Sequence, residues 1–86
     1  MKEQDLIDAG FERVDITAKD SGHKKFHYYS YDFGNHAFSL ITPANDEVSD
    51  GVWFAEVFED DSIRFYDIED VLTLISVINK NTINEI

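Results

Sequence analysis

The chain has 86 residues, no cysteine, and a formal net charge of -11 that comes from 18 acidic and 7 basic side chains. Its length allows a single domain with a small core. The lack of cysteine excludes disulfides, thiolate metal sites and a cysteine nucleophile. The 14% aromatic content argues against a disordered chain, and the acidic excess argues against direct nucleic-acid binding, which needs lysine and arginine.

Neither the start of the chain nor its hydropathy indicates export or a membrane span. Residues 1–5 are polar and lack the apolar segment of a signal peptide. The longest mostly apolar stretch, residues 71–78, is too short to cross a bilayer. These features predict a cytoplasmic protein without membrane contact.

The first quarter of the chain begins with a helical pattern and then changes to a strand pattern. Residues 2–9 are expected to form a short helix with Gly10 at its C-terminal cap. In residues 11–17, apolar and polar side chains alternate, which is typical of a strand with one solvated face. Residues 19–22 have the composition of a turn.

The central part is predicted to be a hairpin. Residues 25–33 form an aromatic strand, residues 37–42 form the returning strand, and Gly34-Asn35 supply a two-residue turn because both tolerate positive φ. This turn fixes the register, which pairs Phe33 with His36, Tyr31 with Phe38, and Tyr29 with Leu40.

The next segment is a long polar loop over residues 43–51, followed by a second hairpin. Its strands are expected at residues 52–58 and 63–66, joined by a turn centred on Asp60-Asp61. This turn places Phe58 opposite Ile63 and brings Arg64 within reach of Glu59.

The last element is predicted to be a helix from Asp67 to Lys80. Asp67 is a favourable N-cap residue, and the acids that follow it suit the first turn of a helix. The apolar residues that recur at helical spacing are Ile68, Val71, Leu72, Ile75 and Ile78.

The order of these elements predicts an α+β fold. Hairpin connections imply an antiparallel five-stranded meander sheet, flanked by a short N-terminal helix and a longer C-terminal helix. We expect one domain over residues 1–81 and a frayed tail over residues 82–86.

No pattern of residues indicates catalysis, a cofactor or a metal. His23 and His27 are four residues apart, but their turn and strand context separates them by about 13 Å. The acidic residues do not match the spacing of a calcium-binding loop. The segment 20–23 contains an acid, a serine and a histidine but has the composition of a turn. The sequence therefore predicts a non-enzymatic protein without a cofactor or metal.

The aromatic strand is apolar on both faces. Phe26 and Tyr28 are expected to face the core, and Tyr29 and Tyr31 then lie where a solvated face would be polar. The fourth strand, which contains Trp53, shows the same excess. We therefore expect the outer side of the sheet to be covered by the first helix, the long loop or another chain. Because tyrosine and tryptophan are favoured at interfaces, Tyr29, Tyr31 and Trp53 are candidate partner-binding residues.

The acidic residues are concentrated in one part of the chain. Residues 46–70 hold ten acidic side chains against Arg64 alone, whereas residues 1–25 hold six acidic and five basic ones. Such a segment attracts and steers a basic partner, although acidity also keeps small domains soluble. The candidate contacts are the loop acids Glu47, Asp50, Asp60 and Asp61.

These observations favour a small acidic protein–protein interaction module whose partner is basic or binds nucleic acid. Alternate acids on a strand are about 6.6 Å apart, comparable to the charge spacing along a phosphate backbone, which suggests an inhibitor that mimics nucleic acid. In size, charge and lack of cysteine the chain resembles short acidic proteins of phages and mobile elements, some of which inhibit host defence nucleases. The alternative is a small structural or regulatory homodimer with no decoy role.

Overall fold

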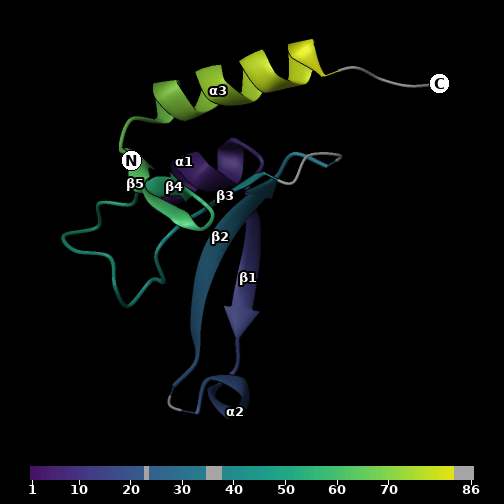
Figure 1. The fold of residues 1–86 in the computed structure, drawn as a ribbon. Coiled ribbons are helices and arrows are strands. Elements are labelled where there is room, and N and C mark those ends of the chain that lie inside the picture. The colour runs from purple at the N-terminus through teal and green to yellow at the C-terminus, as the bar shows by residue number, and fades with distance from the viewer. Residues whose placement is uncertain (23, 35–37, 83–86) are drawn as a thin grey trace.

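The structure is a computed structural model that describes residues 1–22, 24–34 and 38–82. Figure 1 shows an antiparallel sheet in the order β1-β2-β3-β4-β5, with one helix before it and one after it. The predicted α+β meander is therefore confirmed. The elements are α1 (Glu3–Asp8), β1 (Glu12–Ile16), α2 (Ala18–Ser21), β2 (Phe26–Asp32), β3 (Ser39–Ile41), β4 (Ala55–Val57), β5 (Asp60–Phe65) and α3 (Ile68–Asn81).

The first helix ends as its sequence predicts. Gly10 has a φ of 98°, and its N–H donates to the carbonyl of Ile7 at 3.1 Å. The N–H of Phe11 reaches back to the carbonyl of Leu6 at 3.0 Å. These two bonds form a Schellman motif, which turns the chain from the helix into the sheet.

The connection between β1 and β2 is a short helix, so the prediction of a simple turn at residues 19–22 is wrong. The side chain of Thr17 caps α2 by accepting from the N–H of Asp20 at 3.2 Å. Gly22 ends it in the left-handed conformation, with a φ of 78°. An N-cap and a left-handed C-cap at this spacing leave room for one helical turn.

The register between β2 and β3 differs from the predicted one by two residues. Tyr31 pairs with Leu40 and Asp32 with Ser39, where the sequence predicted Tyr31 with Phe38 and Tyr29 with Leu40. The predicted pair of Phe33 and His36 lies outside the described residues. A shift of two residues keeps every side chain on its own face, because side chains alternate with a period of two.

The turn between β4 and β5 also lies two residues earlier than predicted. Val57 pairs with Asp60, so Phe58 and Glu59 form the turn, and Glu59 has a φ of 68°. After an irregularity in the ladder, Arg64 pairs with Glu56. The predicted neighbour of Arg64, Glu59, is replaced by Glu56.

The core lies on the face of the sheet opposite to the predicted one. Tyr29 is 1% exposed and Phe33 is 8% exposed, whereas Phe26 and Tyr28 are only partly buried. Since β2 is apolar at both odd and even positions, its alternation could not show which set faces the helices. The buried apolar cluster consists of Leu6, Phe11, Tyr29, Phe33, Leu40, Trp53, Ala55 and Val71.

The C-terminal helix packs on this core along a narrower stripe than predicted. Asp67 caps α3 by accepting from the N–H of Glu69 at 2.9 Å, as expected. Val71 is fully buried, and Ile68, Ile75 and Ile78 are partly buried against the core. Leu72 is 41% exposed, so its place in the predicted stripe is wrong. It follows Val71 directly, and consecutive helical residues point about 100° apart.

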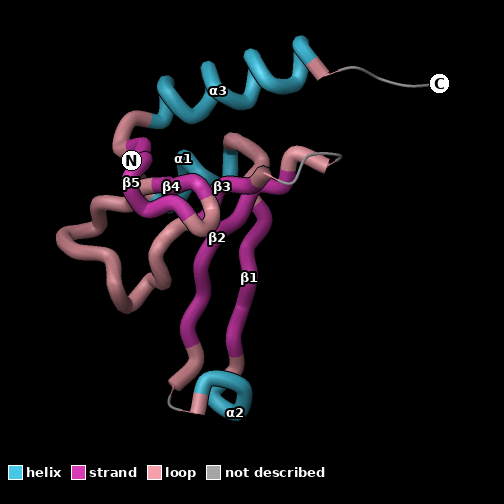
Figure 2. The backbone as a smooth tube through the Cα atoms, in the orientation of Figure 1, coloured by secondary structure: helices cyan, strands magenta, loops and turns pink. Residues whose placement is uncertain are grey.

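The molecule is elongated because only part of the sheet is covered. Figures 1 and 2 show α1 and α3 at one end, while β1 and β2 project away from them as a two-stranded ribbon with α2 at its tip. The extents of the described chain are 44 × 27 × 25 Å. Within the described residues, no helix combines the length and the apolar character that a bilayer crossing requires.

Candidate partner-binding site

The predicted aromatic interface is largely interior. Trp53 is 5% exposed, and its ring meets that of Tyr29 edge-on at 5.5 Å between centroids. Tyr31 is partly buried between Phe11 and Phe33, at 5.5 Å and 4.9 Å between ring centroids. Because helix α1 and the rest of the core already cover them, Tyr29 and Trp53 cannot reach a partner. Their assignment as partner-binding residues is wrong.

The outer face of the sheet carries a partly exposed aromatic group, formed by residues outside the predicted set. Phe54 and Tyr66 pack at 5.3 Å between ring centroids, and the Arg64 guanidinium lies 4.7 Å from the centre of the Phe54 ring. Tyr66 is 53% exposed. The predicted fourth strand is apolar on both faces. This pattern indicates the aromatic group only when it is known which of the two faces is buried.

The acidic residues of the long loop are separated from those of the β4–β5 turn. Asp46 lies 3.6 Å from the ammonium of Lys24, at the start of the β1–β2 ribbon. Glu47 folds back on its own loop and accepts from the N–H of Ala44 at 3.1 Å. Asp50 lies in a tight turn with Gly51, where both residues have positive φ. Residues 46–70 therefore do not form one continuous acidic surface.

The acids at the β4–β5 turn, in contrast, surround an open groove of about 430 Å³. Strand β3 forms one side of this groove through Ile41, and the N–H of Phe58 holds the turn against β3 by donating to the carbonyl of Ser39 at 3.0 Å. Its apolar residues are Ile41, Val57 and Phe58, and its acidic residues are Glu56, Glu59, Asp60 and Asp61. We refer to this feature as the acidic groove.

The acidic groove keeps most of its negative charge. Arg64 pairs with Glu56 at 3.2 Å, but Glu59, Asp60 and Asp61 form no ion pair with any described residue. The side chain and the backbone of Ser62 both donate to the carboxylate of Asp60, which lowers the pKa of Asp60 below its ordinary value. The groove therefore offers, beside an apolar wall, three acidic side chains without an ion pair to a described residue.

Two of the four predicted loop acids, Asp60 and Asp61, line this groove, whereas Glu47 and Asp50 do not. Glu56, Glu59 and Phe58 belong to the groove but were not selected. They could have been found only with the correct turn position, since a turn at residues 58–59 brings Glu56 and Asp60 to the same end of the hairpin. No strand carries acids at alternate positions, so the expected 6.6 Å ladder of charges is absent from the described strands.

A second group of polar residues lies at the other end of the core, where β2 meets α1. One carboxylate oxygen of Glu3 lies 2.7 Å from Nε2 of His27 and accepts from the hydroxyl of Tyr29 at 2.6 Å. The hydrogen bonds from Tyr29 and from His27 lower the pKa of Glu3. Burial and the nearby carboxylate raise the pKa of Tyr29. These contacts tie the first helix to the sheet.

The shifted pKa of Glu3 predicts a loss of stability in acid. A folded-state pKa below the ordinary value of 4.5 means that Glu3 contributes fully above that pH and loses its contribution as the pH falls through the folded value. Glu3→Gln should lower the free energy of unfolding by about 1 kcal/mol at neutral pH, because the Glu3 carboxylate is partly exposed. The variant should also lose less stability than the original protein as the pH falls. Urea unfolding between pH 7 and pH 3 measures both effects. Glu12→Gln is the control, because Glu12 is exposed and makes no such bonds. If the stability of the Glu3 and Glu12 variants falls equally in acid, the role given to Glu3 is contradicted.

The histidines do not form a metal site in the described part of the chain. There, no three histidine or acidic side chains come together in a way that could hold an ion. His27 is engaged with Glu3, and His23 and His36 lie outside the described residues. Comparison with family models, with curated proteins and with solved structures finds no match.

Proposed function

We propose that this chain is a non-enzymatic interaction module that binds a basic partner protein through the acidic groove. The observation that carries the proposal is the combination in one groove of unpaired carboxylates at Asp60 and Asp61 with the apolar side chain of Phe58. A lysine or arginine side chain has the same dual character, with an apolar stem and a charged head. Arginine in particular forms two parallel hydrogen bonds to a carboxylate.

The charge distribution favours a different protein as the partner over a second copy of the chain. A symmetric dimer through the acidic groove would oppose Asp60 and Asp61 to the same residues of the other copy, and the net charge of -11 adds a general repulsion. A basic protein gains attraction on approach. An inhibitor of a nucleic-acid-binding protein is one form of this function, in which the acidic groove occupies a site that normally holds phosphates.

An arginine-rich peptide titrated into the labelled protein tests the location of binding. Amide resonances of residues 56–61 should shift in a saturable way, while those of the loop around Asp50 should move little. Raising the ionic strength to physiological values should weaken binding, because the Debye length falls to about 8 Å. Shifts spread evenly over all acidic residues would instead indicate non-specific attraction and reject the acidic groove as the site.

The inhibitor form of the proposal needs a further measurement. A basic protein captured from the native host should release the chain when duplex DNA or RNA is added, and its own nucleic-acid binding should be blocked by the chain. If the captured protein binds the chain and nucleic acid at the same time, the module binds a basic partner without mimicking nucleic acid.

A further inference from the structure

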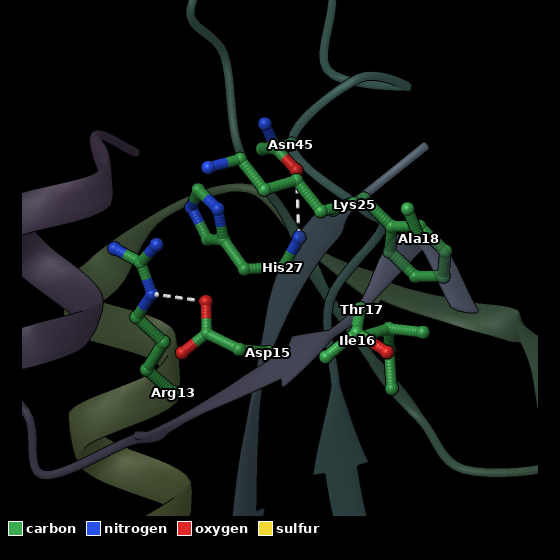
Figure 3. A pocket seen from close by; sticks show the side chains of 9 residues that line it. Arg13, Asp15, Ile16, Thr17, Ala18, Lys25, His27 and Asn45 are labelled. Atoms are coloured by element: carbon green, nitrogen blue, oxygen red, sulfur yellow. Dashed lines mark hydrogen bonds and ion pairs between the residues drawn. The ribbon is translucent and has the colours of Figure 1, made fainter. Parts of the chain in front are cut away.

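The inner face of the β1–β2 ribbon carries a second cavity whose charge is opposite to that of the acidic groove. It has a volume of about 320 Å³ and lies between the ribbon and the start of the long loop. Figure 3 shows the guanidinium of Arg13 and the ammonium of Lys25 on either side of the His27 ring. The lining residues are Arg13, Asp15, Ile16, Thr17, Ala18, Lys25, Phe26, His27 and Asn45.

The register of the ribbon explains why these cations gather. Asp15 pairs directly with His27, and Arg13 pairs with Tyr29, so Arg13 is the diagonal neighbour of His27 on the same face. Lys25 precedes His27 by two residues and shares its face because strand side chains alternate. Three nitrogen-bearing side chains therefore line one side of the cavity.

His27 is held firmly at the centre of this group. Its backbone N–H donates to the side-chain oxygen of Asn45, and its carbonyl accepts from the N–H of Asn45, both at 2.8 Å. Its ring stacks on that of Trp53 at 6.0 Å between centroids, and its Nε2 lies 2.7 Å from Glu3. Its other ring nitrogen, Nδ1, makes no hydrogen bond to any described residue. The ring is thus fixed in orientation while one polar atom stays available.

Arg13 and Lys25 supply the positive charge at the cavity. Arg13 uses its Nε–H on Asp15 at 3.0 Å, which orients the guanidinium, and the guanidinium also interacts with the hydroxyl of Tyr29. Lys25 forms no ion pair with a described residue. Guanidinium and ammonium groups are the usual recognition elements for phosphate and carboxylate oxygens. Ile16 and Phe26 also line the cavity, but they pair with each other and their side chains lie on the opposite face of the ribbon.

We infer that this cavity binds a small oxyanion, a phosphate or carboxylate group. The oxyanion contacts Arg13 and Lys25 beside the His27 ring. The site is independent of the proposed function, because it uses basic residues on the ribbon and none of the acidic groove.

Phenyl phosphate, benzoate and inorganic phosphate, each titrated at low ionic strength, test this inference. We expect saturable binding of at least one organic anion with a Kd of about 1 mM, seen in the amide resonances of residues 13–17 and 25–27. The indole N–H of Trp53 is a convenient second signal, since it is the single tryptophan and stacks on His27. The ranking of phenyl phosphate and benzoate identifies the head group, and inorganic phosphate shows whether the head group alone is sufficient for binding.

Substitutions separate a built site from general attraction of anions. Lys25→Gln removes an exposed and unpaired cation, so the fold should be unaffected and the affinity should fall at least fivefold. Arg13→Gln should lower it further, and circular dichroism verifies that the variant is folded. Lys80→Gln, which removes the same charge from the distant end of α3, should leave the affinity unchanged. No saturation up to 20-fold above the expected Kd, or equal losses for Lys25→Gln and Lys80→Gln, would overturn the inference.

Discussion

Replacing Leu6 with alanine should destabilise the protein by about 2–5 kcal/mol, the range measured for buried leucines. Leu6 is 0% exposed and lies in α1, where it packs in the same cluster as Tyr29 and Val71. Removing its side chain leaves a cavity at the junction of both helices and the sheet. Because a small domain has a total stability of about 5–15 kcal/mol, this loss should be visible as a large shift of the urea midpoint.

The matched control is Leu72→Ala, the same change in a helix at a side chain that is 41% exposed. Leu72 lies beside the buried stripe of α3, so its loss should cost about 1 kcal/mol or less. Chemical denaturation of both variants, followed by circular dichroism, measures the difference. Equal costs at the two positions would mean that Leu6 and Leu72 are buried to a similar extent, which would contradict the packing of both helices on the core.

Reversing the two aspartates of the acidic groove should have the largest effect on binding. Asp60→Lys with Asp61→Lys changes the local charge by four units at residues that are exposed and unpaired. We expect the association rate of an arginine-rich peptide to fall about 10-fold or more at low ionic strength, because electrostatic steering accelerates encounter by at least that factor. The dissociation rate should change less. Stopped-flow mixing over a range of salt concentrations measures both rates.

Two controls distinguish a local effect from a change in net charge. Glu12→Lys with Asp20→Lys changes the total charge equally, but on the β1–β2 ribbon, and should slow association much less. Glu47→Lys tests the loop separately, and a small effect is expected because Glu47 bonds to its own loop and does not line the groove. If the ribbon variant slows association as much as the groove variant, the acidity acts only as a general field.

Much of the local structure follows from neighbouring residues alone. The cap at Asp67 and the left-handed Gly10 depend on contacts within a few residues, and both were predictable for that reason. The α+β class follows from the order of helical and alternating patterns. The acidity of residues 46–70 is a property of composition, and composition alone indicates Asp60 and Asp61 as candidate contacts.

The candidate sites required the tertiary structure. Alternation in β2 shows that the strand has two faces but not which one the helices cover, because Phe26 and Tyr28 are as apolar as Tyr29 and Phe33. The position of the β4–β5 turn decided which acids share the groove. This position depends on a positive φ at Glu59, which the sequence could not predict because glutamate rarely adopts one.

The sequence by itself determined the class of fold, the helix caps and the strongly acidic character of the chain, since these depend on local preferences and on composition. The tertiary structure decided the buried face, the strand register, and the meeting of Glu3 with His27 across 24 residues. Such choices depend on the packing of segments that are distant in the chain. A strand with two apolar faces does not show which face is buried, and only the packing of the helices decides it.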